Sequence, residues 1–302
     1  MSDLKYLIPF DRQYFLLGIN LIQNLIDCKI PANKIFVVDF GLKSNQLDFL
    51  SEASIEVLRT PPHLIGSHPY KLKSHLADYL QAHPLKRGYL IQLDADMLLL
   101  KNPETELTEI IQAMEQAHAQ IALCPDMGPK NTHSGEIGPS IKDFVARYPC
   151  PVFQKLLPKL SLQNPYLNTG FVIYAPTFDL TYFQEIADQM AGEVVWEQNA
   201  INLICASHPD TVYPLNPKDW NLHGKLMEEY DVSQHPFFIH ITSATPNSIS
   251  TGPIHLQIKQ QALESFYFRQ AHNSAVLSIQ DTMLKSLLER NQALFLKHLT
   301  IS

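Results

Sequence analysis

Two patterns of apolar residues alternate along the first third of the chain. Short, nearly continuous apolar runs predict buried strands at residues 4–10, 34–40, 55–58 and 90–93. Between the first two runs, Phe15, Ile19 and Ile22 recur at helical spacing, so we expect a helix that packs one face on a core. Strands that alternate with helices at this rhythm predict an α/β fold with a mixed, mainly parallel sheet flanked by helices.

The same alternation continues toward the C-terminus. Further strands are expected at residues 120–124, 168–174 and 236–241. Further helices are expected near residues 45–50, 72–82, 182–190 and 197–207, and from residue 103 onward. Residues 125–140, rich in glycine and proline, predict a long loop. We therefore expect one α/β domain at residues 1–252 and a helical extension at 253–302 that packs on it or mediates homodimer formation.

Composition and charge exclude several classes of protein. Hydrophobic residues make up 45% of the chain and charged residues 18%, as in ordinary globular proteins. A net charge of −7 without a long basic run argues against nucleic-acid binding. The four cysteines lack CxxC spacing, which predicts free thiols and neither a disulfide framework nor a zinc site. Neither a signal-peptide pattern nor an apolar stretch of roughly 20 residues is found, so we expect a cytoplasmic protein without a transmembrane segment, and peripheral membrane contact stays open.

Two carboxylates follow the apolar run at residues 90–93. Asp94 and Asp96 stand where ligands of open α/β sheets bind, and burying them is costly unless a cation compensates them. His240 also ends an apolar run, and an imidazole beside two carboxylates suits Mn²⁺ better than Ca²⁺ or Mg²⁺. The alternatives are that the aspartates cap turns or helices and that the histidine is hydrogen-bonded at a strand end.

Five segments occur in a characteristic order. They are Asp11-Arg-Gln-Tyr14, Asp94-Ala-Asp96, Asn168-Thr-Gly170, Glu197-Gln198-Asn-Ala-Ile-Asn202 and Phe-Ile-His240. Over residues 4–246 the chain resembles nucleotide-sugar-dependent glycosyltransferases of the GT-A (Rossmann-like) fold. It is most similar to the retaining family 8, which includes glycogenin and bacterial lipopolysaccharide galactosyltransferases. The resemblance implies a nucleoside-diphosphate sugar as donor, a UDP-sugar, and a Mn²⁺ (or Mg²⁺) ion held by Asp94, Asp96 and His240.

The resemblance also assigns residues to the nucleotide. In the family, the aspartate after the first strand hydrogen-bonds uracil and the tyrosine three residues later stacks on it, positions that Asp11 and Tyr14 match. A basic residue before the Asp-x-Asp strand contacts the diphosphate, and Lys73 is the first choice, with Lys71 the second. Asp94 is expected to be shared with the ribose of the donor. From the residues alone, Asp11 could equally be a helix cap, Tyr14 a half-buried helix residue and each lysine a solvated one.

On the sugar side, Asn168 and Gly170 match the residues that line the family's sugar pocket. Glu197 and Gln198 match the acidic residue that holds sugar hydroxyls and the glutamine whose amide lies near the anomeric carbon. The alternatives are a glycine that serves only a turn and two exposed polar residues on a helix.

One segment departs from the family pattern. In the family, the metal-binding histidine is followed by glycine and then by Lys-Pro-Trp, whose lysine contacts the leaving diphosphate, whereas His240 is followed by Ile-Thr-Ser-Ala-Thr-Pro246. Either Lys130 or Lys218 replaces that cation, or the donor is held differently. The stretch Trp220-Asn221-Leu-His223 resembles the loop that precedes the last strand in related enzymes.

The resemblance implies metal-dependent transfer of a sugar with retention of configuration, to a saccharide, lipid-linked or protein acceptor that the sequence does not specify. Retention needs no dedicated base, because the leaving phosphate oxygen can accept the proton; inversion would need Glu197 or a loop residue as base. Two other functions stay open. The missing lysine keeps open a catalytically silent nucleotide-sugar-binding protein, and the lack of glycine at residues 10–14 argues against a sugar-phosphate nucleotidyltransferase.

Overall fold

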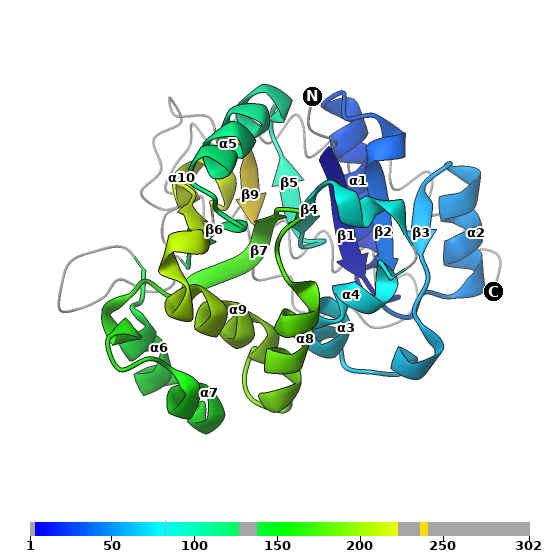
Figure 1. Cartoon of the computed structure of the whole chain (residues 1–302). Helices are drawn as coiled ribbons and strands as arrows, with labels where there is room; N and C mark the ends of the chain where they lie inside the picture. Colours follow the sequence, from blue (N-terminus) through cyan, green and yellow to red (C-terminus); the bar gives the residue numbers. More distant parts are fainter. Residues whose placement is uncertain (1–3, 82, 127–137, 223–235, 241–302) are drawn as a thin grey trace, which may run out of the picture.

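A seven-stranded sheet forms the centre of the molecule, with the strand order β3-β2-β1-β4-β7-β6-β8 (Figure 1). The structure is a computed structural model that describes residues 4–81, 83–126, 138–222 and 236–240. In sheet order the strands are Glu56–Leu58, Ile35–Asp39, Leu4–Phe10, Tyr89–Leu93, Leu167–Tyr174, Ile121–Pro125 and Val212–Pro214. The predicted mixed, mainly parallel sheet is confirmed.

The strand directions place a switch point of the chain at one edge of this sheet. β1 is parallel to β2 and β4, β2 to β3, and β6 to β8, whereas β7 is antiparallel to both β4 and β6. The chain builds outward from β1 to β3 and then returns to β4 on the other side of β1, so the order reverses between β1 and β4. Ligands of open α/β sheets bind at such a switch point. Because Phe171 pairs with Leu93, the reversed β7 starts at this same edge.

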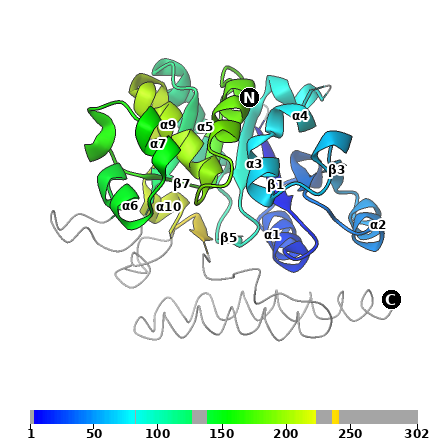
Figure 2. The same ribbon diagram turned by 90° about the horizontal axis from the view of Figure 1, so that it is seen from below.

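Helices cover both faces of the sheet. One face packs against α1 (Phe15–Asp27) and α5 (Glu104–Gln116), and the other against α3 (Pro69–Ser74), α4 (Leu76–Tyr79), α8 (Leu180–Gln189) and α9 (Trp196–Ser207). Figure 2 shows α1 and α3 on opposite sides of β1. Successive residues of β1 divide between the two cores, Ile8 on the α1 side and Leu7 on the α3 side. Burial on both faces explains why the strands are continuous apolar runs.

A second, two-stranded sheet stands beside the first. It pairs β5 (Met97–Leu99) with β9 (Phe238–His240), and Met97 lies opposite His240. Asn24 of α1 fixes β5, because its side-chain amide exchanges two hydrogen bonds with the backbone of Leu99. The sequence predicted a strand near residues 236–241 but not this partner, since three residues are too few to give a recognisable apolar pattern.

The helices differ from the prediction in two ways. The single helix expected at residues 72–82 is two short helices, because His75 leaves the helical conformation between α3 and α4 (φ −97°, ψ 32°). Helices that were not expected are α6 (Ile141–Arg147), α7 (Pro151–Leu156) and α10 (Pro217–Trp220), whereas α2 (Ser44–Glu52) lies where a helix was predicted.

Two predicted segments cannot be compared with the structure. Most of the loop expected at residues 125–140 and the whole extension expected at 253–302 lie outside the described residues. Within the described ranges, every helix is too short or too polar to cross a membrane.

Candidate functional site

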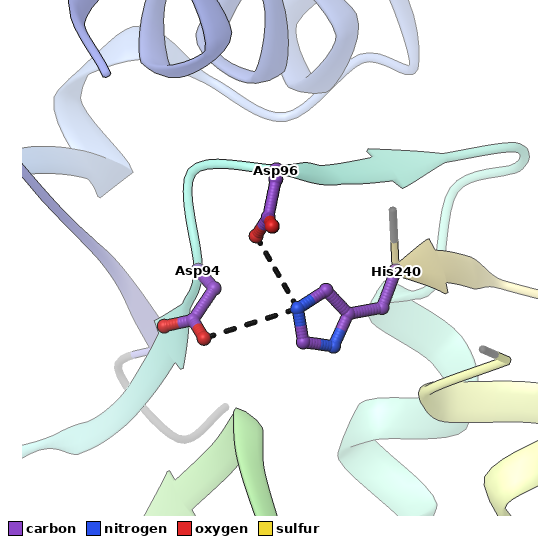
Figure 3. Close-up of side chains that lie close together, drawn as sticks. All are labelled: Asp94, Asp96 and His240. Carbon is purple, nitrogen blue, oxygen red and sulfur yellow. Dashed lines mark ion pairs between the residues drawn. The ribbon is translucent and has the colours of Figure 1, made fainter. Parts of the chain in front are cut away.

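The three predicted metal ligands converge at the carboxyl end of β4. Asp94 directly follows β4, Asp96 lies in the turn that leads into β5, and His240 ends β9 (Figure 3). Nε2 of His240 lies 3.2 Å from a carboxylate oxygen of Asp96 and 3.9 Å from one of Asp94. One ligand atom from each residue lies within 4.8 Å of the other two. The sequence predicted that these residues follow or end strands, and this was sufficient to predict that their side chains converge.

This set of atoms fits a divalent cation. Two carboxylate oxygens and one imidazole nitrogen can reach a single ion, and a mixture of oxygen and nitrogen ligands suits Mn²⁺. Burial lowers the pKa of His240, but the carboxylates of Asp96 and Asp94 outweigh burial and raise the pKa above its usual value. A protonated imidazole balances part of the negative charge that a metal ion would otherwise balance.

Lys73 contacts the same aspartate from the other direction. Its ammonium nitrogen lies 2.7 Å from a carboxylate oxygen of Asp94 and 3.5 Å from one of Glu197, and it donates a hydrogen bond to the hydroxyl of Thr169. Burial lowers the pKa of Lys73, but the two carboxylates outweigh it and the pKa is raised, so the lysine is charged. The structure therefore places Lys73 between two acidic side chains.

Glu197 is a buried acid with spare hydrogen-bonding capacity. Only 4% of the residue is exposed, and its Oε2 has no hydrogen-bond partner among the described residues. Burial raises the pKa of Glu197, while Lys73 acts in the opposite direction. The residue sits in the first turn of α9, which follows Val195 in a left-handed conformation (φ 42°) that is uncommon for a β-branched side chain. A carboxylate oxygen held in this way can accept a hydrogen bond from a substrate hydroxyl.

Asn168 and Gln198, predicted to lie at the donor sugar, share one carboxylate. The amide of Asn168 donates to Oδ2 of Asp126 (3.1 Å), and that of Gln198 lies 3.5 Å from the same oxygen. The backbone N–H of Thr169 donates to Oε1 of Gln198 (3.1 Å). The sequence reasoning missed Asp126 and Thr169. Asp126 directly follows β6 just as Asp94 follows β4, and this position is the signal that could have identified it.

Gly170 lies where a side chain would collide with the candidate metal centre. A Cβ added to it would come within 2.4 Å of Cε1 and 2.5 Å of Nδ1 of His240. Its carbonyl oxygen accepts a hydrogen bond from the backbone N–H of Asp94 (2.9 Å). The glycine thus allows β7 and the imidazole to approach each other, in addition to its predicted place near the sugar pocket.

Asp11 and Tyr14 lie at the end of β1. Oδ1 of Asp11 accepts hydrogen bonds from the backbone N–H groups of Gln13 (2.8 Å) and Tyr14 (3.0 Å), so it caps the turn that precedes α1. Burial raises the pKa of Tyr14, and the carboxylates of Asp96 and Asp94 add to this effect. The tyrosine therefore lies within electrostatic reach of the candidate metal ligands.

Of the other lysines considered from the sequence, Lys71 and Lys218 are among the described residues. Lys71 pairs with Asp188 of α8 at 3.7 Å, with both side chains well exposed, and so does not join Lys73. Lys218 is an exposed residue of α10. Lys130 lies outside the described residues.

Three aromatic rings pack together next to Glu197. The ring centroids of His68 and Tyr70 lie 4.8 Å and 5.4 Å from that of Trp196, which directly precedes Glu197 in the chain. His68 is exposed, and Tyr70 and Trp196 are half-buried. Glu197 and Lys73 both act on the pKa of Tyr70, which burial raises. This aromatic cluster therefore borders the buried ion pair of Glu197 and Lys73.

The strand order and the switch point are those of the GT-A glycosyltransferase fold, and comparison with solved structures confirms that fold. A complex of the galactosyltransferase LgtC with donor and acceptor sugar analogs matches with a TM-score of 0.54 and 14% identity, over 86% of this chain and 95% of that one. At such low identity the likeness establishes the fold and not the activity.

Two further structures match over most of this chain. WbbM, a bifunctional glycosyltransferase, gives a TM-score of 0.52 at 14% identity, and the match covers 86% of this chain and 51% of WbbM. The glycosyltransferase GlyE of Streptococcus pneumoniae gives 0.50 at 12% identity, over 94% of this chain and 64% of GlyE. The chain thus spans about half of WbbM and about two thirds of GlyE. No protein-family model and no curated protein matches this chain in sequence.

Proposed function

We propose that this protein is a metal-dependent glycosyltransferase that transfers a sugar from a nucleoside-diphosphate sugar, a UDP-sugar, to an acceptor hydroxyl with retention of configuration. The observation that carries the proposal is the position of Asp94. Its carboxylate belongs to the candidate metal centre, with Asp96 and His240, and also pairs with Lys73, which in turn pairs with the buried Glu197. A donor with its diphosphate at the candidate metal centre and its sugar beside Lys73 and Glu197 would span this aspartate.

The candidate metal centre suits the charge that develops in this reaction. Breaking the bond between the anomeric carbon and the phosphate oxygen leaves a diphosphate with growing negative charge. A divalent ion held by Asp94, Asp96 and His240 supplies a Lewis acid when bound. Asp11 and Tyr14, at the neighbouring end of β1, are proposed to hold the uracil base.

The pocket beside α9 supplies the contacts to the sugar. Oε2 of Glu197 would accept a hydrogen bond from a sugar hydroxyl. Asp126 and Thr169 orient the amide of Gln198, which is proposed to lie beside the anomeric carbon. As the acceptor oxygen bonds to that carbon, its proton passes to the leaving phosphate oxygen, so no protein base is required.

The aromatic cluster of His68, Tyr70 and Trp196 is proposed to contact the acceptor. Ring faces pack well against the C–H face of a sugar, and Trp196 of this cluster directly precedes Glu197 in the chain. A saccharide, free or on a lipid or protein, would meet this requirement. All four cysteines are free thiols, which supports a reducing, cytoplasmic environment.

The test is a screen of donor hydrolysis and transfer. Purified protein is incubated with UDP-, GDP- and other nucleotide sugars, with and without Mn²⁺, and the released nucleoside diphosphate is measured. We expect turnover of a UDP-sugar that requires the metal ion, and NMR of the product should show the anomeric configuration of the donor. Binding of nucleotide sugars without turnover would replace the proposal with a silent binding protein.

A further inference from the structure

Asn221, the residue after α10, is completely buried and joins the candidate metal centre to the sugar pocket. Its amide nitrogen donates to Oδ1 of Asn168 (2.8 Å), and its Oδ1 lies 3.0 Å from Nδ1 of His240. The sequence marked this residue only as part of a loop before the last strand.

The direction of each hydrogen bond in this chain of amides is fixed by one backbone group. The N–H of Gly170 can only donate, and it lies 2.8 Å from Oδ1 of Asn168, so that atom is an oxygen. The same oxygen accepts from Asn221, which must therefore present its nitrogen to Asn168 and its oxygen to His240. Facing an oxygen, Nδ1 of His240 must carry a hydrogen.

The tautomer of His240 follows from this arrangement. In the neutral imidazole that a metal ion would bind, a hydrogen on Nδ1 leaves the lone pair on Nε2. Nε2 is the atom that lies 3.2 Å from Asp96 and faces the candidate metal centre (Figure 3). The ring cannot easily turn its nitrogens away from Asn221 and Asp96, because it is 5% exposed and packs directly against the backbone of Gly170.

We infer that Asn221 is a positioning residue that holds His240 with its metal-binding nitrogen toward Asp94 and Asp96, and that it links this histidine to the donor-sugar contact Asn168. The inference rests on the proposed function, since it assumes that the centre binds a metal ion. A histidine that binds a metal commonly donates its other N–H to a neighbouring oxygen, which fixes the ring and its tautomer. An amide is suited to this place because it can accept from His240 and donate to Asn168 at once, which a carboxylate cannot do.

The first test measures Mn²⁺ binding without nucleotide, from the electron paramagnetic resonance signal of free Mn²⁺. Asn221→Leu removes both hydrogen bonds, and we expect its Mn²⁺ affinity to fall about 10- to 100-fold. Asn221→Asp can still accept a hydrogen bond from Nδ1, so its Mn²⁺ affinity should fall no more than about threefold. As a matched control, Asn199→Leu removes an equally buried amide that bonds to Tyr166 and Val194, and Mn²⁺ affinity should not change.

The second test separates the two hydrogen bonds of Asn221. In Asn221→Asp a carboxylate faces Oδ1 of Asn168, so KM for the UDP-sugar should rise while Mn²⁺ affinity is kept. Equal Mn²⁺ affinity of Asn221→Leu and wild type, with wild-type turnover intact, would overturn the positioning role and leave the proposed function standing. Wild-type protein that binds no Mn²⁺ would overturn both. Equal losses in Asn221→Leu, Asn221→Asp and Asn199→Leu would show a general loss of folding, which circular dichroism checks, and would also reject the inference.

Discussion

The two oxygens of the Asp94 carboxylate face two different kinds of cation. One is bound by Lys73, whose buried charge is permanent; the other faces His240 and, across the candidate metal centre, Asp96. On the histidine side, the positive charge depends on protonation of the imidazole or on an added ion. The Asp-x-Asp motif is therefore not a symmetrical pair of ligands. Asp94 joins a fixed ion pair to an exchangeable cation site, whereas Asp96 lies on the exchangeable side.

The largest effect on activity is expected from Asp96→Asn, which weakens the histidine side. It removes a charged metal ligand with little change of shape, so donor turnover should fall about 10²- to 10³-fold, as when a charge-stabilising group is lost from an active site. The release of UDP from the UDP-sugar, measured across a range of Mn²⁺ concentrations, checks this. Asp179→Asn, which alters an exposed helix cap of α8, is the control and should keep full turnover. Unchanged turnover of the Asp96 variant would refute the metal assignment.

Lys73→Met removes the ion pair on the lysine side, and its main effect should be on the free energy of unfolding. Removing one partner of a buried ion pair costs about 3–5 kcal/mol, and the partial exposure of Asp94 points to the lower value. Lys71→Met is a matched control two residues earlier in α3, because its exposed pair with Asp188 should contribute within about 0.5 kcal/mol. Urea denaturation gives both values. A similar loss in the two variants would mean that Lys73 is an ordinary surface lysine.

The stability lost in Lys73→Met should also depend on pH. Burial already raises the pKa of Glu197, and the variant removes the opposing effect of the lysine, so the folded-state pKa moves further above that of the unfolded chain. Protonation then stabilises the folded state at low pH, and this stability is lost as the pH rises through the raised pKa. The difference from wild type should thus be smaller near about pH 5 than near about pH 8. The same difference at both values would contradict this explanation.

A smaller effect is expected at Asp126, which binds the two amides that are proposed to contact the donor sugar. Asp126→Asn removes the negative charge that accepts from Asn168 and Gln198, so affinity for the UDP-sugar should fall about tenfold, in line with the loss of a hydrogen bond to a charged group. Affinity for UDP alone, which lacks the sugar, should be unchanged. Calorimetric titration of both ligands tests this, and equal losses for the two would place Asp126 outside the sugar pocket.

The smallest change is expected from Trp196→Leu, which tests whether the acceptor approaches from the lysine side. Loss of one aromatic contact is worth about 0.5–1.5 kcal/mol, so KM for the acceptor should rise about 2- to 12-fold. Hydrolysis of the donor without acceptor and affinity for Mn²⁺ should stay at wild-type values. Tyr148→Leu changes an exposed aromatic residue of another segment and serves as the control. A matching rise in that control would show a general surface effect.

Much of the fold could be predicted from the sequence because the strands of the main sheet are buried on both faces. The run expected at residues 4–10 is β1 (Leu4–Phe10) itself, and β4 (Tyr89–Leu93) begins one residue before the expected run. Strand direction is not encoded in an apolar run, so the antiparallel β7 was not foreseen. Helix α3 ends at His75 because of a local backbone conformation that helical spacing does not reveal.

The site was predicted in part, for a similar reason. Asp94, Asp96 and His240 each follow or end an apolar run, so their convergence could be inferred from strand ends alone. The side-chain partners of these residues could not be inferred in this way. Lys73 pairs with Glu197 and Asn221 with Asn168 across separations of more than fifty residues, and such pairs depend on the packing of helices and loops. The assigned roles of these residues stay predictions until they are tested by variants.

The two sheets contribute unequally to the candidate metal centre. Asp94 is tied to the main sheet through its bond to Gly170, whereas Asp96 and His240 flank the small sheet of β5 and β9. An ion held by all three would act as a cross-link between the sheets. We expect Mn²⁺ to slow hydrogen exchange at β5 and β9 far more than at β3, which mass spectrometry can resolve. Release of the ion and loosening of the small sheet would then be coupled, so that the ion leaves only as fast as this sheet opens.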